Sequence, residues 1–315
     1  MAHEDAEGPA ALLLTATVAR RYYVDGANKS EIAAELDLSR FKVARLIEHA
    51  RATGLVRIEF DDRGEFDLDL SLRLQSAHGL RHCVVVDGPD DGDLLRAGIG
   101  RAAARLLTEI VGSDDVLGLA WARTLLAMRS SLTRLAPCTL VQLTGAMSRP
   151  DVEESAVELV RDIAKLSGGP AHTFYAPMIV PDAATASVMR TQPEIARALE
   201  MCGQVTKAVV GVGAWQPGLS TVADAVTERE WREGRDRGVC AEIGGIQLDT
   251  EGGPVTTSLT DRLIGIDAGR LRAVDDVIGL VYGAEKADAV RAALRGGFVT
   301  SLVTHGAMAR ALLPP

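Results

Sequence analysis

Short loops that combine small residues with a cation or a hydroxyl follow several strand-like segments of this sequence. They are Trp121–Thr124, Gly211–Trp215, Gly283–Lys286 and Thr304–Gly306. A loop of small residues that leads into a helix presents backbone N–H groups to an anion, and a nearby cation adds attraction. We therefore expect Arg123, Thr124 and Lys286 to hold the anionic or hydroxyl-rich end of a small molecule. Each loop taken alone also fits an ordinary turn between a strand and a helix.

A second group of residues that could bind a charged partner is a run of bases near the N-terminus. Between Ser39 and Arg57 the chain carries five Lys or Arg residues and one acid, although its net charge is −9. Cations gathered in one segment suit the phosphate backbone of DNA, whereas the acidity of the remaining chain limits non-specific binding. The segment therefore predicts a DNA-binding element.

The surroundings of these bases have the pattern of a helix-turn-helix. Apolar residues at helical spacing predict a first helix within residues 11–25. Asn28 and Glu31 stand at the spacing of a capping box, which predicts the start of a second helix. Ser39 is a favourable N-cap for a third helix that runs to about residue 53. Ala33 supplies the small residue that two closely crossing helices need.

The third predicted helix has one apolar and one basic face. Its inward stripe recurs at helical spacing and consists of Val43, Leu46, Ile47 and Ala50. We expect the other positions to contact DNA, namely Ser39, Arg40, Phe41, Lys42 and Arg45. An outward Phe41 suits the methyl group of thymine. The alternative is an ordinary amphipathic surface helix with a basic face.

Composition changes after this helix. Leu55–Phe60 alternates like a short strand or wing, and the acidic stretch Asp61–Asp69 follows it. We place the domain boundary there, which gives a helical DNA-binding domain over 1–60 and a larger domain over 61–315.

One residue departs from the usual helix-turn-helix pattern, because the turn position where glycine is frequent holds Asp37. Aspartate tolerates the left-handed conformation better than most residues.

The larger domain alternates apolar strand-like runs with amphipathic helices. We expect strands at Cys83–Asp87, Val116–Ala120, Thr139–Leu143, Thr173–Ala176, Ala208–Val212, Leu263–Ile266, Val277–Tyr282 and Val299–Val303. Continuous apolar strands separated by helices indicate a mostly parallel sheet that is covered on both faces. The fold class is therefore α/β: an all-α helix-turn-helix domain plus a mostly parallel, Rossmann-like domain that binds an effector.

Bulk composition excludes several classes. No apolar run approaches the roughly 18 residues of a membrane span, and the acidic N-terminus lacks the pattern of a secretory signal, so we expect a cytoplasmic protein. The four cysteines are scattered, with no CxxC pair and no histidine at metal-ligand spacing. We expect reduced, buried thiols, and neither a metal nor a cofactor.

Nearly the whole chain resembles the SorC family of sugar-binding transcriptional regulators. The stretches that carry the resemblance include VARRYYVDGANKSEIAAELDLSRFKVARLIEHARATGLVRI, GIGRAAARLL, DVLGLAWARTL, VQLTGAMSRPDVE, AVVGVGAW, TDRLIGI and EKADAVRAALRGGFVTSLVTHGAMARALL. The resemblance implies an effector domain similar to ribose-5-phosphate isomerase, glucosamine-phosphate deaminase and CoA-transferases. It also implies a sugar, sugar-phosphate or polyol effector, and a homodimer or homotetramer.

The resemblance also implies particular site residues. The family's first phosphate loop corresponds to Trp121–Thr124, where Ala122 replaces the usual glycine and adds a methyl group at the closest backbone approach. The second loop corresponds to residues 144–146, again with Ala146 in place of glycine. Effector-binding residues implied in this way are Trp121, Arg123, Thr124, Gly145, Asp261, Glu285 and Lys286. The added methyl groups leave a non-phosphorylated polyol as an alternative effector.

Two other classes of function compete with a regulator that binds operator DNA under effector control. A sugar-phosphate isomerase or deaminase with an accessory DNA-binding module would need a positioned general base. His305 follows the last strand, but the sequence assigns it no carboxylate partner, so we expect no enzyme activity and no catalytic residues. A pure interaction module is disfavoured by the several ligand-type loops. The sequence does not distinguish repression from activation.

Overall fold

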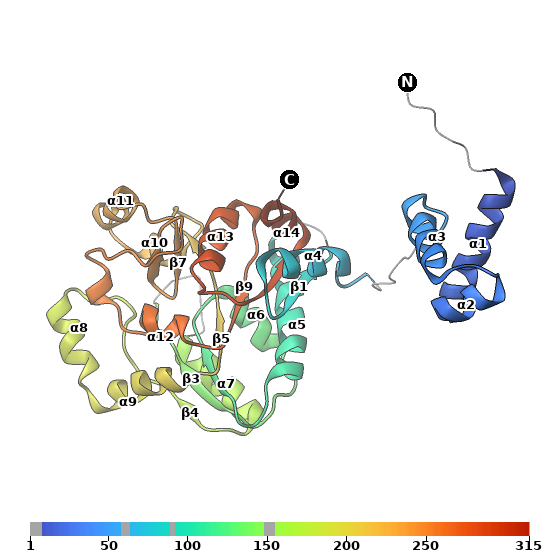
Figure 1. The fold of residues 1–315 in the computed structure, drawn as a ribbon. Coiled ribbons are helices and arrows are strands. Elements are labelled where there is room, and N and C mark those ends of the chain that lie inside the picture. The colour runs from blue at the N-terminus through green and yellow to red at the C-terminus, as the bar shows by residue number, and fades with distance from the viewer. Residues whose placement is uncertain (1–7, 58–63, 89–91, 148–154, 315) are drawn as a thin grey trace. The chain divides into compact units, whose positions relative to one another are not determined.

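The computed structural model describes residues 8–57, 64–88, 92–147 and 155–314. The chain divides into two compact units, Met1–Asp61 and Asp62–Pro315 (Figure 1). The described residues of the N-terminal unit form three helices, α1 (Pro9–Tyr23), α2 (Lys29–Glu35) and α3 (Arg40–Ala52). Val18, Ile32, Val43 and Ile47 form its buried core, so each helix contributes at least one side chain to the packing.

Local side-chain hydrogen bonds fix where α2 and α3 begin. The Asn28 carboxamide oxygen accepts from the backbone N–H groups of Ser30 (2.9 Å) and Glu31 (3.1 Å). The Glu31 carboxylate accepts in return from the Asn28 N–H at 2.9 Å, which completes the predicted capping box. Ser39 Oγ accepts from the Lys42 N–H at 3.2 Å, as expected of an N-cap.

The turn between α2 and α3 contains a residue with an unusual backbone conformation. Asp37 has φ +50° and is the only non-glycine residue with positive φ in the part of the chain that the structure describes. The N–H of Leu38 donates to the Ala33 carbonyl at 2.9 Å and closes the turn. The expected wing Leu55–Phe60 lies partly outside the described residues, and residues 55–57 are not in a strand.

The C-terminal unit is built on a seven-stranded sheet in the order β1-β10-β9-β5-β2-β3-β4, with every neighbouring pair parallel. The strands are β1 (Cys83–Val86), β2 (Val116–Leu119), β3 (Thr139–Gln142), β4 (Ala171–His172), β5 (Lys207–Val210), β9 (Asp276–Leu280) and β10 (Ser301–His305). This parallel α/β architecture confirms the predicted fold class.

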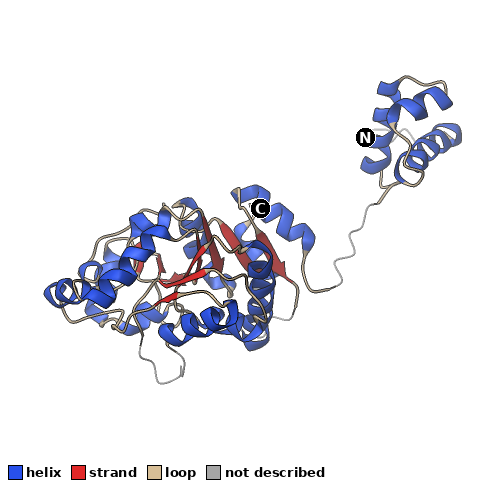
Figure 2. Ribbon diagram, turned by 90° about the horizontal axis from the view of Figure 1, so that it is seen from below, coloured by secondary structure: helices blue, strands red, loops and turns tan. Residues whose placement is uncertain are grey.

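Helices cover both faces of this sheet (Figure 2). One face packs against α5 (Gly92–Ile110), α6 (Arg123–Ser131) and α7 (Ala156–Ser167). The other packs against α4 (Leu68–His78), α12 (Ala268–Arg272), α13 (Ala287–Arg295) and α14 (Gly306–Leu312). Successive strand residues alternate between the two cores: Val209 faces the first helix layer, whereas Ala208 and Val210 face the second. A sheet buried on both sides explains why the strands are apolar throughout.

Two predicted strands are wrong in detail. No residue of the expected segment Thr173–Ala176 lies in a strand, since the two-residue strand β4 ends at His172, and Leu263–Ile266 lies outside the sheet. Both apolar runs are buried nevertheless, since Phe174 and Ile264 share a separate core cluster with the helices α8 (Ala183–Arg190) and α9 (Pro193–Met201). Leu263 and Gly265 form isolated β-bridges with Ile179 and Thr144, but these pairings do not extend into a strand of either sheet. Burial, rather than a place in the main sheet, therefore accounts for the hydrophobicity of both runs.

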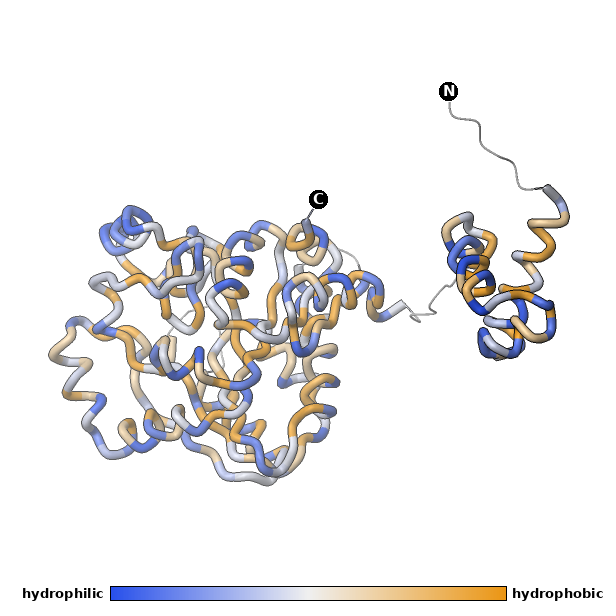
Figure 3. The backbone as a smooth tube through the Cα atoms, viewed as in Figure 1, coloured by the Kyte–Doolittle hydropathy of each residue, from blue (hydrophilic) through white to orange (hydrophobic). Residues whose placement is uncertain are grey.

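A small antiparallel sheet follows β5 and was not predicted. It consists of β6 (Gly213–Ala214), β7 (Ala241–Ile243) and β8 (Ile246–Leu248). The β7–β8 turn uses Gly244 and Gly245, both with positive φ. The helices α10 (Thr221–Ala225) and α11 (Glu228–Asp236) lie between β6 and β7 in the sequence. Figure 3 shows α11 as a mainly hydrophilic coil, whereas hydrophobic stretches follow the central strands.

Candidate functional site

A pocket lies at the carboxyl ends of the central strands in the C-terminal unit. The chain leaves β2 toward β3 on one side and leaves β5 toward β9 on the other, so the winding reverses between β2 and β5. Ligands of open parallel sheets bind at such a reversal. The cavity has a volume of about 200 Å³, and the residues used below that line it are Trp121, Ala122, Arg123, Thr124, Thr144, Gly211, Gly213, Ser220, Asp224, Glu242, Tyr282 and Lys286.

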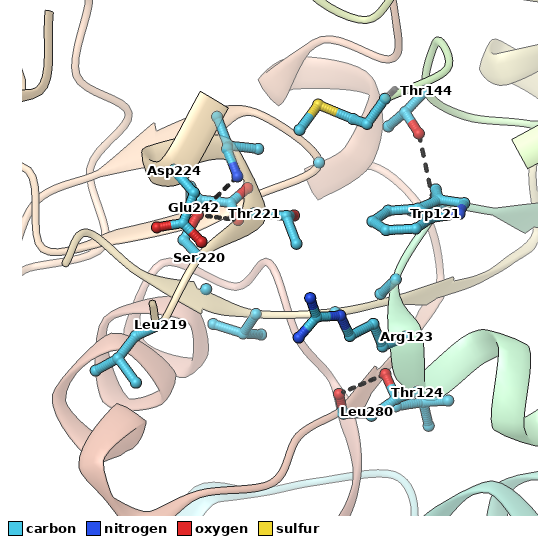
Figure 4. A pocket seen from close by; sticks show the side chains of 18 of the residues that line it. Trp121, Arg123, Thr124, Thr144, Leu219, Ser220, Thr221, Asp224, Glu242 and Leu280 are labelled. Carbon is cyan, nitrogen blue, oxygen red and sulfur yellow. Dashed lines mark hydrogen bonds between the residues drawn. The ribbon is translucent and has the colours of Figure 1, made fainter. Parts of the chain in front are cut away.

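The loop from β2 into α6 forms the basic wall of the pocket. Figure 4 shows the Arg123 side chain extending into the cavity from this loop. Trp121 is buried, and its backbone N–H donates to Thr144 Oγ1 at 3.4 Å. Thr124 Oγ1 donates to the Leu280 carbonyl at 3.3 Å, which ties the first turn of α6 to the end of β9. The positive end of the α6 dipole and the Arg123 charge therefore act at the same place.

The facing wall comes from α10 and the small sheet. Ser220 is the N-cap of α10, because its Oγ accepts from the N–H groups of Val222 (3.1 Å) and Ala223 (3.0 Å). The same hydroxyl donates to Glu242 Oε1 at 2.9 Å. The other carboxylate oxygen of Glu242 accepts from the Gly245 N–H at 3.0 Å. Glu242 thus joins the start of α10 to the β7–β8 turn across the pocket wall.

Burial raises the pKa of Glu242 above the usual glutamate value. The hydrogen bonds from Gly245 and Ser220 and the charge of Lys286 oppose this shift but do not cancel it. The protonated form of this carboxyl group, which can donate a hydrogen bond, is therefore favoured more than in an exposed glutamate.

Lys286 contributes a second cation at the end of β9. Its Nζ lies 4.8 Å from the centre of the Tyr282 ring. The Arg96 guanidinium lies 5.0 Å from the same ring and donates to the Tyr282 hydroxyl at 3.0 Å. Cation–π contacts of this kind position a lysine without neutralising it. The pocket is therefore lined by two cations, Arg123 and Lys286, and by two acids, Asp224 and Glu242.

Ala122 and Gly211 form a close contact between two pocket loops. A Cβ atom added at Gly211 would lie 2.8 Å from the Ala122 Cβ and would have no other neighbour within 4 Å. The methyl group of Ala122 therefore occupies the space that the missing side chain of Gly211 leaves.

Four of the seven effector residues expected from sequence line the pocket, namely Trp121, Arg123, Thr124 and Lys286. The other three lie elsewhere. Gly145 packs against the main chain of Met178, Asp261 is exposed in a 3-10 turn, and Glu285 is exposed beside Lys286. The loop Thr304–Gly306 is not part of the lining either.

Sequence reasoning missed Ser220, Asp224 and Glu242, which form the acidic wall. Only Glu242 carried a local signal. It stands alone among apolar residues in Ala-Glu-Ile directly before the Gly244–Gly245 pair. An acid inside an apolar hairpin is costly to bury unless it has partners or a function.

The described part of α3 presents a basic face. Arg40, Phe41, Lys42 and Arg45 are all exposed, whereas the opposite side of the helix, with Val43, is buried. No acid among the described residues forms an ion pair with these three cations. Their charges are therefore available to an anionic partner.

Within the described residues, no helix has the length and apolar character needed to cross a membrane. No group of three or more His, Cys, Asp or Glu side chains there is arranged to hold a metal ion.

Comparison with known proteins agrees with the fold. The family model described as "Putative sugar-binding domain" matches residues 62–314. The chain is 31% identical over 303 residues to YjhU, a transcriptional regulator of Escherichia coli K12, which covers 93% of this chain and 92% of that protein. It is 28% identical over 311 residues to the transcriptional regulator LsrR of the same strain, which covers 95% and 93%.

Among solved structures, the full-length sorbitol operon regulator SorC from Klebsiella pneumoniae has a TM-score of 0.74 at 22% identity, over 96% of this chain and 99% of that chain. Together, the two-unit fold, the pocket and the relatives define a class: transcriptional regulators that respond to sugars. The chain belongs to the SorC family of sugar-binding transcriptional regulators. These relatives are regulators rather than enzymes, so the isomerase or deaminase alternative has no support.

Proposed function

We propose that the pocket at the β2–β5 reversal binds the effector, a small sugar, sugar phosphate or polyol of a catabolic pathway. One observation carries this proposal: Arg123 and the α6 N-terminus line the same cavity of about 200 Å³ as Lys286 and the buried Glu242. The cations suit a phosphate or the oxygen-rich end of a sugar, and the acidic wall suits hydroxyl donors. Trp121 and Thr124 frame the basic end.

Thermal unfolding of the full chain with a panel of sugar phosphates, free sugars, polyols and inorganic phosphate tests this proposal. A compound at a hundredfold its Kd stabilises the folded state by about 2.7 kcal/mol. That is a rise in Tm of about 5–10 °C for a unit of this size. Arg123→Ala and Lys286→Ala should abolish the rise, whereas Lys165→Ala, an exposed lysine of α7, should retain it. Normal binding by both pocket variants would place the effector site elsewhere.

We also propose that α3 reads operator DNA through Ser39, Arg40, Phe41, Lys42 and Arg45. The support is the exposed, unpaired basic face of this helix in a chain that belongs to a family of regulators. Arg45 lies in the second turn of α3, near the N-terminal end with which a recognition helix contacts base edges. The proposal places the protein in the cytoplasm, where operator DNA is found.

The DNA probe is a duplex enriched from a random pool by repeated binding to the purified full chain, called the selected duplex below. Arg45→Ala should weaken its binding about tenfold to a hundredfold, the cost of one bidentate base contact. Arg45→Lys keeps the charge but loses the planar fork, so it should weaken binding by a similar factor. Unchanged affinity of Arg45→Ala would refute the role of α3.

A homodimer or homotetramer is part of the proposal, because one short helix with few cations is a weak reader and symmetric oligomers pair two readers on a palindrome. The selected duplex should therefore be palindromic. Sedimentation of the full chain with and without that duplex measures the assembly. A monomer at micromolar concentration in both conditions would contradict the proposal.

A further inference from the structure

Phe41 stands out on the surface of the N-terminal unit. It is 85% exposed, the highest value among the large apolar side chains of the described residues. Its place is fixed, because the Ser39 cap holds the first turn of α3 and Phe41 is the second residue of that helix. A single exposed apolar side chain needs no explanation by itself. Phe41 differs from such a side chain because it lies among the exposed cations Arg40, Lys42 and Arg45.

Helical geometry sets the direction in which Phe41 points. Residues four apart share a face of a helix, so Phe41 and Arg45 lie together one turn apart. Val43, Ile47 and Ala50 are the buried residues of α3, on the opposite side. Because a recognition helix enters the major groove with its N-terminal residues at the base edges, Arg45 cannot reach a base without taking Phe41 into the groove beside it.

The major groove offers a phenyl ring only one apolar partner. Hydrogen-bond donors and acceptors line the edges of all four base pairs, and the C5 methyl group of thymine is the sole hydrocarbon feature. From this match we propose that Phe41 is a specificity-determining residue that packs on a thymine methyl group in each operator half-site. The proposal rests on the proposed DNA-reading role of α3 and adds which base feature it reads.

Removal of one thymine methyl group at a time from the DNA tests the proposal. Each thymine of the selected duplex is replaced in turn by deoxyuridine, which removes the methyl group and leaves base pairing unchanged. Burial of one such group changes affinity about fourfold. We therefore expect one thymine per half-site at which deoxyuridine weakens binding about fourfold. Equal binding of every deoxyuridine duplex would overturn the proposal while leaving DNA binding itself established.

Phe41→Ala completes the comparison. This variant should bind the thymine and deoxyuridine duplexes with equal affinity, because the ring that senses the methyl group is gone. Leu13→Ala removes another exposed apolar side chain, 68% exposed on α1, and should keep the fourfold difference. Persistence of the difference in Phe41→Ala would refute the assignment. So would a loss of affinity for both duplexes that accompanies a smaller sedimenting assembly, because it would place Phe41 between copies of the chain.

Discussion

The contact between Ala122 and Gly211 allows a sharp test of the pocket geometry. A methyl group added at Gly211 would lie 2.8 Å from the Ala122 Cβ, whereas two such carbons pack at about 3.5–4.0 Å. Neither loop is free to retreat. The Ala122 carbonyl accepts from the N–H groups of Leu125 (3.0 Å) and Leu126 (3.2 Å), and the neighbouring Ala120 N–H donates to Val209 at 3.1 Å.

Gly211→Ala should therefore overpack the pocket and lower the free energy of unfolding by about 1–3 kcal/mol. For a unit of this size the Tm falls by about 2–4 °C for each kcal/mol. Ala122→Gly removes the obstructing methyl group and costs little, because glycine is acceptable at an N-cap. The double variant should be about as stable as Ala122→Gly alone, so the two substitutions are coupled by most of the 1–3 kcal/mol.

Calorimetry and urea unfolding of the wild type, the two single variants and the double variant measure this coupling. Gly145→Ala is the matched control, since its added Cβ would lie 2.7 Å from the Met178 main chain, an overlap that Ala122→Gly does not relieve. A double variant as unstable as Gly211→Ala would refute the reasoning. So would rescue of Gly145→Ala by Ala122→Gly.

Two further predictions concern the caps and the buried acid. Asn28→Ala should lower the free energy of unfolding of the N-terminal unit by about 1 kcal/mol, which hydrogen exchange detects as faster amide exchange in α2. Ser30→Ala, at an exposed neighbouring position, should lower it less, and equal effects of the two substitutions would contradict the capping box. For Glu242, burial raises the pKa in the folded state, so the wild type loses stability as pH rises from the ordinary glutamate value through the raised one. Glu242→Gln lacks this loss, and its stability relative to wild type, measured by urea unfolding, should increase from pH 5 to 8; parallel curves would contradict the assignment.

Local patterns made much of the fold predictable. The capping box at Asn28, the Ser39 cap and the left-handed Asp37 follow from side chains that hydrogen-bond or tolerate the turn within a few residues. The parallel strands were predictable because burial on both faces leaves uninterrupted apolar runs. The strand expected at Leu263–Ile266 is absent from the main sheet, because an extended segment with buried side chains and only isolated bridges has the same composition as a sheet strand.

Only the basic side of the pocket was predictable from sequence, because its residues follow strands of the main sheet, whereas the acidic residues lie in short elements after β5. Arg123 and Lys286 follow strands directly, and the carboxyl ends of parallel strands converge by topology. Ser220 reaches the cavity from the start of the short helix α10 and Glu242 from the small sheet, and elements this short leave little periodicity to detect. Glu285 is the neighbour of Lys286 in sequence, but its exposed side chain is outside the lining, because sequence spacing does not fix the direction of a side chain. Asp261 was expected from the family resemblance alone and is also exposed outside the lining.

The proposed control of DNA binding by a sugar-type effector requires that each partner change the other's affinity for this chain. Its most direct test is the affinity of the full chain for the selected duplex, measured by fluorescence anisotropy with and without the compound that raises Tm. Allosteric coupling of about 1–3 kcal/mol predicts a change of about five- to 150-fold in DNA affinity. The duplex must change the compound's affinity by the same factor, because coupling is reciprocal. Binding of both partners with no mutual effect, or turnover of the compound by the protein, would contradict the account.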